Sequence, residues 1–195
     1  MDLIAHKADD GRMQPFNEHA VNVASLASEF AKEFRGSDQA YALGLLHDIG
    51  KCSPAGQRRI RGISPDKVEH AAAGAEVLGS NIKENPFGYL LAYCIAGHHA
   101  GLPDGGVSTD TEDRATLCAK LKRQAKRKRD YAPFEDTLSQ PIPEAAAFPL
   151  DYAKLHLGFS YAFRIRMLFS CLVDADFLDT ESFMNLVALR GGIGD

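Results

Sequence analysis

Apolar residues recur along most of this chain at the three- and four-residue spacing of amphipathic helices, and alternating runs of β-branched residues are scarce. This pattern predicts an almost entirely helical protein. Asn17 and either Ser37 or Asp38 are suitable N-caps for the first two helices, which are expected to end at Gly36 and near Gly50. Helices are predicted over about 17–36, 37–50, 66–78, 86–99, 112–129 and 151–178.

The segments between these helices are rich in glycine, proline and charged residues, as surface loops are. They cover residues 54–65, 101–111 and 132–148. The last predicted helix is apolar on most of its faces, which is typical of a helix at the centre of a bundle. We therefore predict an all-α fold: one compact helical bundle formed by residues 1–190, followed by a tail at 191–195 that resembles the start of a linker.

Composition narrows the class of protein. A chain of 195 residues with 45% hydrophobic and 25% charged residues is typical of a single globular domain. Because the net charge is -4, nucleic acid would have to bind to a local patch or to bound metal ions. The four cysteines are widely spaced, the N-terminus has no signal-peptide pattern, and no segment approaches about 20 uninterrupted apolar residues. These features predict a soluble cytoplasmic protein with no membrane partner.

Candidate metal ligands lie near the ends of several predicted helices. The pair His47–Asp48 closes the second helix, and Lys51 follows one turn after His47. Imidazole nitrogens combined with carboxylate oxygens suit Mn, Fe, Co, Ni or Zn better than Mg. The candidate ligands are more numerous than one ion can coordinate. They suit two divalent ions that share a carboxylate and leave coordination positions for water and substrate. The candidate set comprises His19, His47, Asp48, His70, His98, His99 and one aspartate of the run Asp174–Ala175–Asp176.

Several short motifs follow one another in a recognisable order. They are Ala5–His6, Glu18–His19, Leu46–Lys51 (LHDIGK), Glu69–His70, Gly97–Pro103 (GHHAGLP), Arg166–Ser170 and Asp179–Glu181. In these motifs, nearly from end to end, the chain resembles the HD superfamily of metal-dependent phosphohydrolases. It is most similar to the HD nuclease domain of the CRISPR-associated nuclease-helicase of type I systems. The histidine doublet and the last stretch carry this closer resemblance.

The resemblance implies an HD-domain bundle around a two-metal site that cleaves single-stranded DNA. Two-metal activation of water would lead to attack on a backbone phosphodiester, with Asp48 and Lys51 as catalytic residues and Lys51 at the scissile phosphate. Asp176 fits the family pattern better than Asp174, and His6 is expected to have a structural or supporting role. The first metal position would comprise His19, His47, Asp48 and Asp176, and the second Asp48, His70, His98 and His99, so that Asp48 bridges both.

The helicase of that family is not encoded in this sequence, which contains no GxxxxGK[ST] phosphate-binding loop. The expected partners are single-stranded DNA, a superfamily 2-type helicase in cis or in trans, and the CRISPR RNA-guided surveillance complex. The chain is expected to be either a stand-alone nuclease subunit or a domain cut before its helicase, and its linker-like ending favours the second.

Two groups of basic residues are candidates for contacts with DNA. Residues 120–129 carry seven positive charges, and such a run is either a phosphate-contacting strip or a solvated helix with no binding role. The second group follows Lys51 by a few residues. The candidates are Lys122, Arg123, Lys126 and Arg127 in the run, and Arg58, Arg59 and Arg61 in the second group.

Two other functions share parts of this pattern. An HD phosphohydrolase acting on nucleotides or cyclic nucleotides would use the same ligands, but it requires a closed pocket that recognises a base. A non-catalytic, metal-stabilised docking module is disfavoured because the ligand set is intact. Comparing the hydrolysis of single-stranded DNA and of nucleotides in Mn²⁺ distinguishes these functions.

Overall fold

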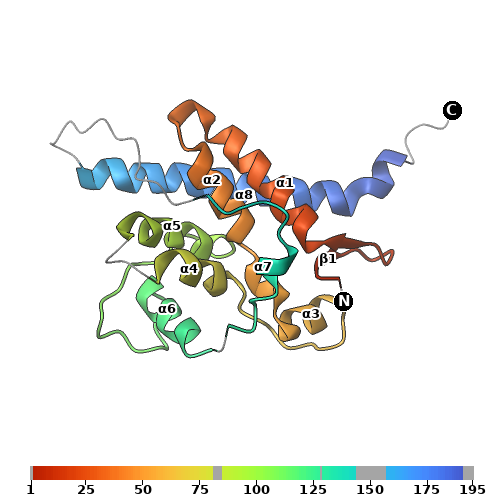
Figure 1. Cartoon of the computed structure of the whole chain (residues 1–195), viewed down its shortest axis with the longest axis horizontal. Coiled ribbons are helices and arrows are strands. Elements are labelled where there is room, and N and C mark those ends of the chain that lie inside the picture. Colours follow the sequence, from red (N-terminus) through yellow and green to blue (C-terminus); the bar gives the residue numbers. More distant parts are fainter. Residues whose placement is uncertain (1, 81–84, 128, 144–156, 191–195) are drawn as a thin grey trace.

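The computed structural model describes residues 2–80, 85–127, 129–143 and 157–190 (Figure 1). This part of the chain is predominantly helical, with one two-stranded sheet, and the predicted all-α class is confirmed. The elements are β1 (Ile4–Lys7), β2 (Met13–Pro15), α1 (Phe16–Phe30), the 3₁₀ turn η1 (Lys32–Phe34), α2 (Ser37–Leu46), the 3₁₀ turn η2 (Ile49–Cys52), α3 (Pro54–Ile60), α4 (Ala71–Gly79), α5 (Pro86–Gly97), α6 (Leu117–Ala125), α7 (Phe134–Thr137) and α8 (Leu157–Arg190).

Small side chains let the helices around the histidine motifs approach one another closely. Helices α1 and α2 bury a series of alanines between them, including Ala24 and Ala40. A Cβ atom at Gly74 of α4 would overlap the carbonyl oxygen of Leu46, and one at Gly50 of η2 would overlap the backbone of His70. Glycine is therefore required at both positions, and the close contacts hold the end of α2 against the start of α4.

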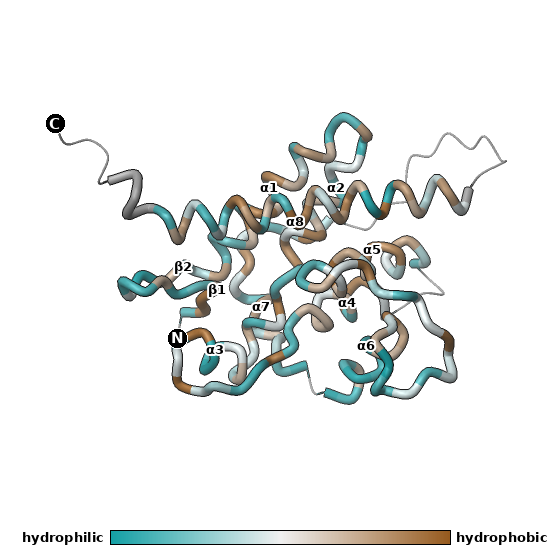
Figure 2. The backbone as a smooth tube through the Cα atoms, turned by 180° about the vertical axis from the view of Figure 1, so that it is seen from behind, coloured by the Kyte–Doolittle hydropathy of each residue, from teal (hydrophilic) through white to brown (hydrophobic). Residues whose placement is uncertain are grey.

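Helix α8 extends along the length of the molecule and packs on α1, α2 and α5 (Figure 1). Its buried side includes Leu168, Leu172 and Ala175, but Phe159 is 72% exposed and Phe177 is 63% exposed. Figure 2 accordingly shows brown and teal segments alternating along α8. The predicted central position of this helix is therefore wrong. A high apolar content indicates that a helix packs against other elements, but it does not say on how many sides.

Several element boundaries also differ from the predictions. The predicted loop over 54–65 contains α3, which is capped by the Ser53 hydroxyl accepting from the Gly56 amide. The hairpin β1–β2 was not predicted, because strands this short leave little periodicity in the sequence. Helix α1 begins at Phe16, so Asn17 is not its N-cap. Helices α4 and α6 begin later than predicted, at Ala71 and Leu117.

Two further expectations concern the chain ends and membranes. The tail predicted at 191–195 and the start of the last predicted helix, at 151–156, lie outside the described residues. Within the described part, no helix combines the length and the apolar character that crossing a membrane demands.

Candidate metal centre

Most of the candidate ligands converge because helices end or begin where these residues lie. His47 follows the last residue of α2, and Asp48 precedes the first residue of η2. His70 immediately precedes α4, and His98 immediately follows α5. His19 lies near the start of α1, and Asp176 comes from the middle of α8. The seven predicted ligands therefore come together from five helices that are distant in sequence.

The first metal position predicted from the sequence has a geometry that suits an ion. The Nε2 atoms of His19 and His47 are 3.2 Å apart, and each lies 3.4 to 3.6 Å from Oδ2 of Asp48 and from Oδ1 of Asp176. These distances are five edges of a nearly regular tetrahedron. With edges of about 3.4 Å, its centre lies about 2.1 Å from each corner, a usual bond length for Zn²⁺ and similar ions. Asp174 is exposed and takes no part in this arrangement.

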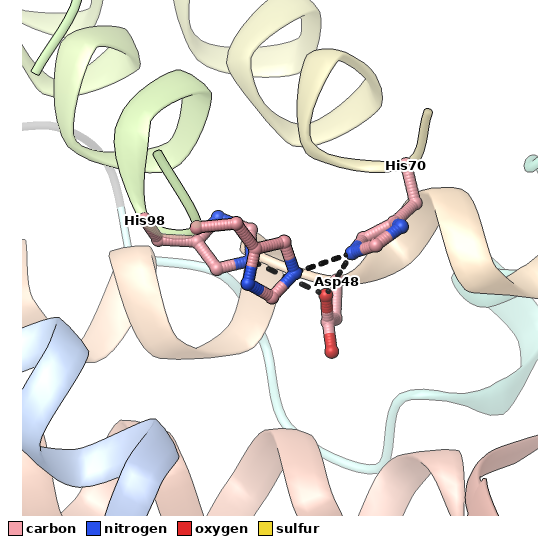
Figure 3. Close-up of side chains that lie close together, drawn as sticks. Asp48, His70 and His98 are labelled. Atoms are coloured by element: carbon pink, nitrogen blue, oxygen red, sulfur yellow. Dashed lines mark hydrogen bonds and ion pairs between the residues drawn. The ribbon is translucent and has the colours of Figure 1, made fainter. Parts of the chain in front are cut away.

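Asp48 lies between the two predicted positions and presents one oxygen to each. While Oδ2 faces His19 and His47, Oδ1 lies 3.2 Å from Nε2 of His70 and 3.5 Å from Nε2 of His98 (Figure 3). The fourth member, His99, has its Nε2 2.7 Å from Nε2 of His70. Asp48, His70, His98 and His99 offer donor atoms that lie within 4.8 Å of one another. This arrangement suits a carboxylate that bridges two ions.

Hydrogen bonds at the far side of each ring direct the histidines toward the centre. The Nδ1 of His47 lies 2.8 Å from the carbonyl of Gly44, and the Nδ1 of His98 lies 2.7 Å from that of Ile95. When Nδ1–H donates to such a carbonyl, the lone pair of Nε2 is left for a metal ion. Nε2 of His98 is buried and makes no hydrogen bond to any described residue, and the buried oxygens of Asp48 face Lys51 and the histidine nitrogens. Buried polar atoms without such partners are expected where an ion belongs.

Asp179 positions His19 in the same way, and it was not predicted as a site residue. Its Oδ2 lies 2.7 Å from Nδ1 of His19 and also accepts a hydrogen bond from Gln14, while its Oδ1 accepts one from Asn22. A signal was present in the sequence, because Asp179 comes three residues after Asp176 and therefore lies on the same helix face.

The ionisable groups at the centre are strongly coupled. Burial opposes the charged forms of His19 and His47, but the neighbouring carboxylates outweigh burial and raise the pKa of His19 to about 9 and that of His47 to about 10. Burial alone would raise the pKa of Asp48, yet Lys51 and His47 lower it well below its usual range. Without an ion, protonated imidazoles therefore offset the carboxylates. A metal ion would take over that charge and displace the protons.

Lys51 and His6 lie on one side of the first position. Nζ of Lys51 is 2.5 Å from Oδ2 of Asp48 and 3.3 Å from Nε2 of His6. His6 offers a donor atom within 4.8 Å of those of His19, Asp48 and Asp176. The structure thus places His6 beside the first position, and the supporting role predicted for it stays a prediction. Burial and the charge of Lys51 lower the pKa of His6 to about 3, so its ring is neutral at physiological pH.

The predicted DNA-contacting residues are placed differently from one another. Arg59 is exposed and lines a cleft of about 260 Å³ together with Lys51, His70 and Lys67, a residue that was not predicted. Arg58 is exposed on the same helix, whereas Arg61 donates to the carbonyl of Asp2 and to the side chain of Gln57.

The basic run begins in α6 and continues past the end of that helix at Ala125, and several of its side chains contact other parts of the chain. Lys122 donates to the carbonyls of Ser108 and Asp110, and Arg123 donates to those of Glu112 and Arg114. Lys126 pairs with Glu112, and Arg127 donates to the carbonyl of Glu69. These contacts hold the loop before α6, and the predicted contacts of the run with DNA stay a prediction.

The comparison with known families agrees with this centre. The family model of the HD domain matches residues 16–131, more than half of the chain. The chain belongs to the HD domain family. Membership implies a metal-dependent phosphohydrolase that binds divalent ions, and the two groups of His and Asp side chains agree with this activity. The match includes His19 to His99 of the ligand set, while His6, Asp176 and Asp179 lie outside it. The curated proteins contain no match to the chain.

Proposed function

We propose that this HD domain is a metal-dependent endonuclease that cleaves single-stranded DNA in type I CRISPR interference. The observation that carries the choice of substrate is the cleft beside the metal centre. Its lining includes Lys51, Arg59 and Lys67, and no acidic residue occurs among the described residues that line it. Arg59 and Lys67 are exposed, so the cleft opens to solvent next to His70. Such a cationic, open cleft suits a polymeric phosphate backbone.

The residues of the metal centre would have different roles in phosphodiester hydrolysis. His19, His47, Asp48 and Asp176 would hold one ion, and Asp48, His70, His98 and His99 the other. When bound, two such ions lower the pKa of coordinated water and offset charge on the phosphate. Asp48 keeps both positions at a fixed separation because its oxygens face opposite ways. Lys51, which is partly exposed, would donate to a phosphate oxygen at the mouth of the cleft and stabilise its developing charge.

Two features favour a nucleic acid over a free nucleotide. The described residues lining the cleft include no phenylalanine or tyrosine on which a single base would stack. In addition, the motifs Gly97–Pro103 and Arg166–Glu181 resemble those of the CRISPR-associated nuclease more closely than those of nucleotide phosphohydrolases. From the same resemblance we propose a cytoplasmic protein whose partners are a superfamily 2-type helicase, in cis or in trans, and the RNA-guided surveillance complex.

The test uses circular single-stranded DNA, whose linearisation requires endonucleolytic cleavage. In Mn²⁺, Ni²⁺ or Co²⁺ the wild type should linearise the circle while binding about two ions per chain. Asp48→Ala should bind neither ion tightly and lose cleavage by about three orders of magnitude, as expected when several kcal/mol of charge stabilisation disappear. Mononucleotides and cyclic nucleotides are assayed in parallel.

Charge reversal tests the cleft separately from the chemistry. The pair Arg59→Glu and Lys67→Glu should raise KM for DNA and flatten its salt dependence, but leave hydrolysis of bis(p-nitrophenyl) phosphate unchanged. The matched control reverses two charges just after α6, at Lys126 and Arg127, and compares the basic run with the cleft directly. Nucleotide hydrolysis without DNA cleavage would establish the nucleotide phosphohydrolase instead. Cleavage by pure Asp48→Ala protein would remove the metal centre from the mechanism.

A further inference from the structure

The hairpin β1–β2 precedes the segment matched by the HD domain model, yet it contributes to the metal centre. The two strands pair antiparallel, and their register shifts between Ile4 and His6. Such an irregularity changes the direction in which side chains leave a strand, and it is common beside active sites. Here it accompanies a partly buried His6 whose ring lies edge-on to that of His19, with 4.6 Å between their centroids.

The buried side chain of Gln57 fixes the hairpin to the turn that carries Lys51. Its Nε2 donates to the carbonyls of both Ile4 and Lys51, at 2.8 and 2.9 Å, and its Oε1 accepts from the amide of Ile4. One amide group therefore joins β1 to η2. On the other side of the hairpin, Gln14 donates to Asp179 of α8. The position of His6 relative to Lys51 is thus held from two directions.

Among the described residues, His6 and Asp48 both act as acceptors for the Lys51 ammonium. Nζ of Lys51 lies 2.5 Å from Oδ2 of Asp48 and 3.3 Å from Nε2 of His6, and the Thr180 hydroxyl lies 3.5 Å from the same nitrogen of His6. A metal ion on Oδ2 of Asp48 would weaken the attraction of that oxygen for Lys51. A lysine side chain loses much rotamer entropy when it is held in one position, so an ammonium that loses its partner tends to turn into solvent.

We propose that His6 is a positioning residue, supplied by the N-terminal hairpin, that keeps the Lys51 ammonium at the metal centre when Asp48 is engaged by an ion. Its Nε2 accepts a hydrogen bond from Nζ of Lys51 and leaves the other ammonium hydrogens for a phosphate oxygen of the substrate. The phosphate contact rests on the proposed function, while the contact between His6 and Lys51 does not.

The first measurement needs no substrate. The rate at which an N-hydroxysuccinimide ester acetylates each lysine is followed by mass spectrometry, with and without Mn²⁺. In His6→Ala, Lys51 should react about tenfold faster than in the wild type when Mn²⁺ is present, the factor expected for one lost hydrogen bond to a charged group. His6→Gln, which retains an acceptor, should restore slow labelling. Lys7→Ala is the matched control because Lys7 is an exposed residue of the same strand.

Two further measurements separate positioning from other roles. The affinity for Mn²⁺ should stay within about twofold of wild type in His6→Ala, whereas a metal donor would lower it tenfold or more. With bis(p-nitrophenyl) phosphate, His6→Ala should lower kcat about tenfold, and the variant combined with Lys51→Ala should be no slower than Lys51→Ala alone. A loss of Mn²⁺ affinity, unchanged Lys51 labelling, or additive effects on kcat would each overturn the proposal. If no variant and no wild type hydrolyses a phosphodiester, the proposed function fails, while the labelling and Mn²⁺ titrations still decide the role of His6.

Discussion

Asp179→Asn should weaken the first metal position without removing any ligand. Asp179 lies among three donors: Gln14 and Asn22 at 2.7 and 2.8 Å, and Nδ1 of His19 at 2.7 Å. An asparagine has one acceptor oxygen and one amino group, so its amino group must face at least one of these donors. In one orientation the amino group faces Nδ1 of His19, which loses its orienting hydrogen bond. In the other it faces Asn22, and His19 keeps a neutral acceptor in place of the carboxylate. Substituting such a partner usually costs 10- to 100-fold in metal affinity, or about 1.4 to 2.7 kcal/mol.

The assay is a calorimetric titration with Mn²⁺ under argon near pH 9, the value to which the pKa of His19 is raised. At lower pH the substitution would also weaken the competition between protons and metal at His19, and this would mask part of the loss. The affinity of one site should fall by the stated factor while the second site stays unchanged. The matched control is Asp174→Asn, which makes the same change of charge at an exposed position of the same helix.

Equal affinities for Asp179→Asn and wild type would refute the reasoning, because His19 would then be positioned without the carboxylate. An equal loss in the Asp174 control would show that the helix charge and not the hydrogen bond is responsible. A loss at both metal sites would contradict the assignment of His19 to the first position alone.

Three other predictions follow from the geometry. Because His19 and His47 are protonated below pKa values of about 9 and 10, binding of the first ion should release up to about two protons at neutral pH, and the affinity for the ion should rise with pH up to those values. Calorimetry in buffers of different ionisation enthalpy measures the number of protons released. Binding without proton release would contradict this prediction. Gly50→Ala should lower the free energy of unfolding by about 1 to 3 kcal/mol, because the new Cβ would overlap the His70 backbone. Gly158→Ala is the control, since a Cβ there would meet open space and should not lower stability. Equal melting temperatures of the two variants would refute the close contact at Gly50. Lys122→Ala should speed amide exchange in residues 106–114 about tenfold, since Lys122 donates to the carbonyls of Ser108 and Asp110. Arg129→Ala, whose partner Glu135 lies outside this loop, should change it little. Identical exchange in both variants would show that Lys122 does not anchor the loop.

Sequence alone determined the helical class, and it predicted seven residues that the fold brings together at the candidate metal centre. The three- and four-residue spacing of apolar residues is a local property, so it predicted α2 and α5 closely. Histidines and aspartates near predicted helix ends can be recognised in the sequence, and the structure brings them together with Asp176 from the middle of α8. The choice of Asp176 over Asp174 rested on a motif, and the tetrahedral arrangement around His19 and His47 agrees with that choice.

Only the tertiary structure showed which groups support those ligands. His6 reaches Lys51 because Gln57 joins two segments that are about 50 residues apart, a contact without periodicity in the sequence. Lys67 and Arg59 share a cleft because the segment before α4 passes beside α3. Side chains of the basic run, such as Lys122, donate hydrogen bonds to the loop before α6. The exposed face of α8 was mispredicted for the same reason. The burial of a residue depends on which elements pack together in the folded protein. The pattern of apolar residues along the chain predicts which residues prefer to be buried, but not which element covers them.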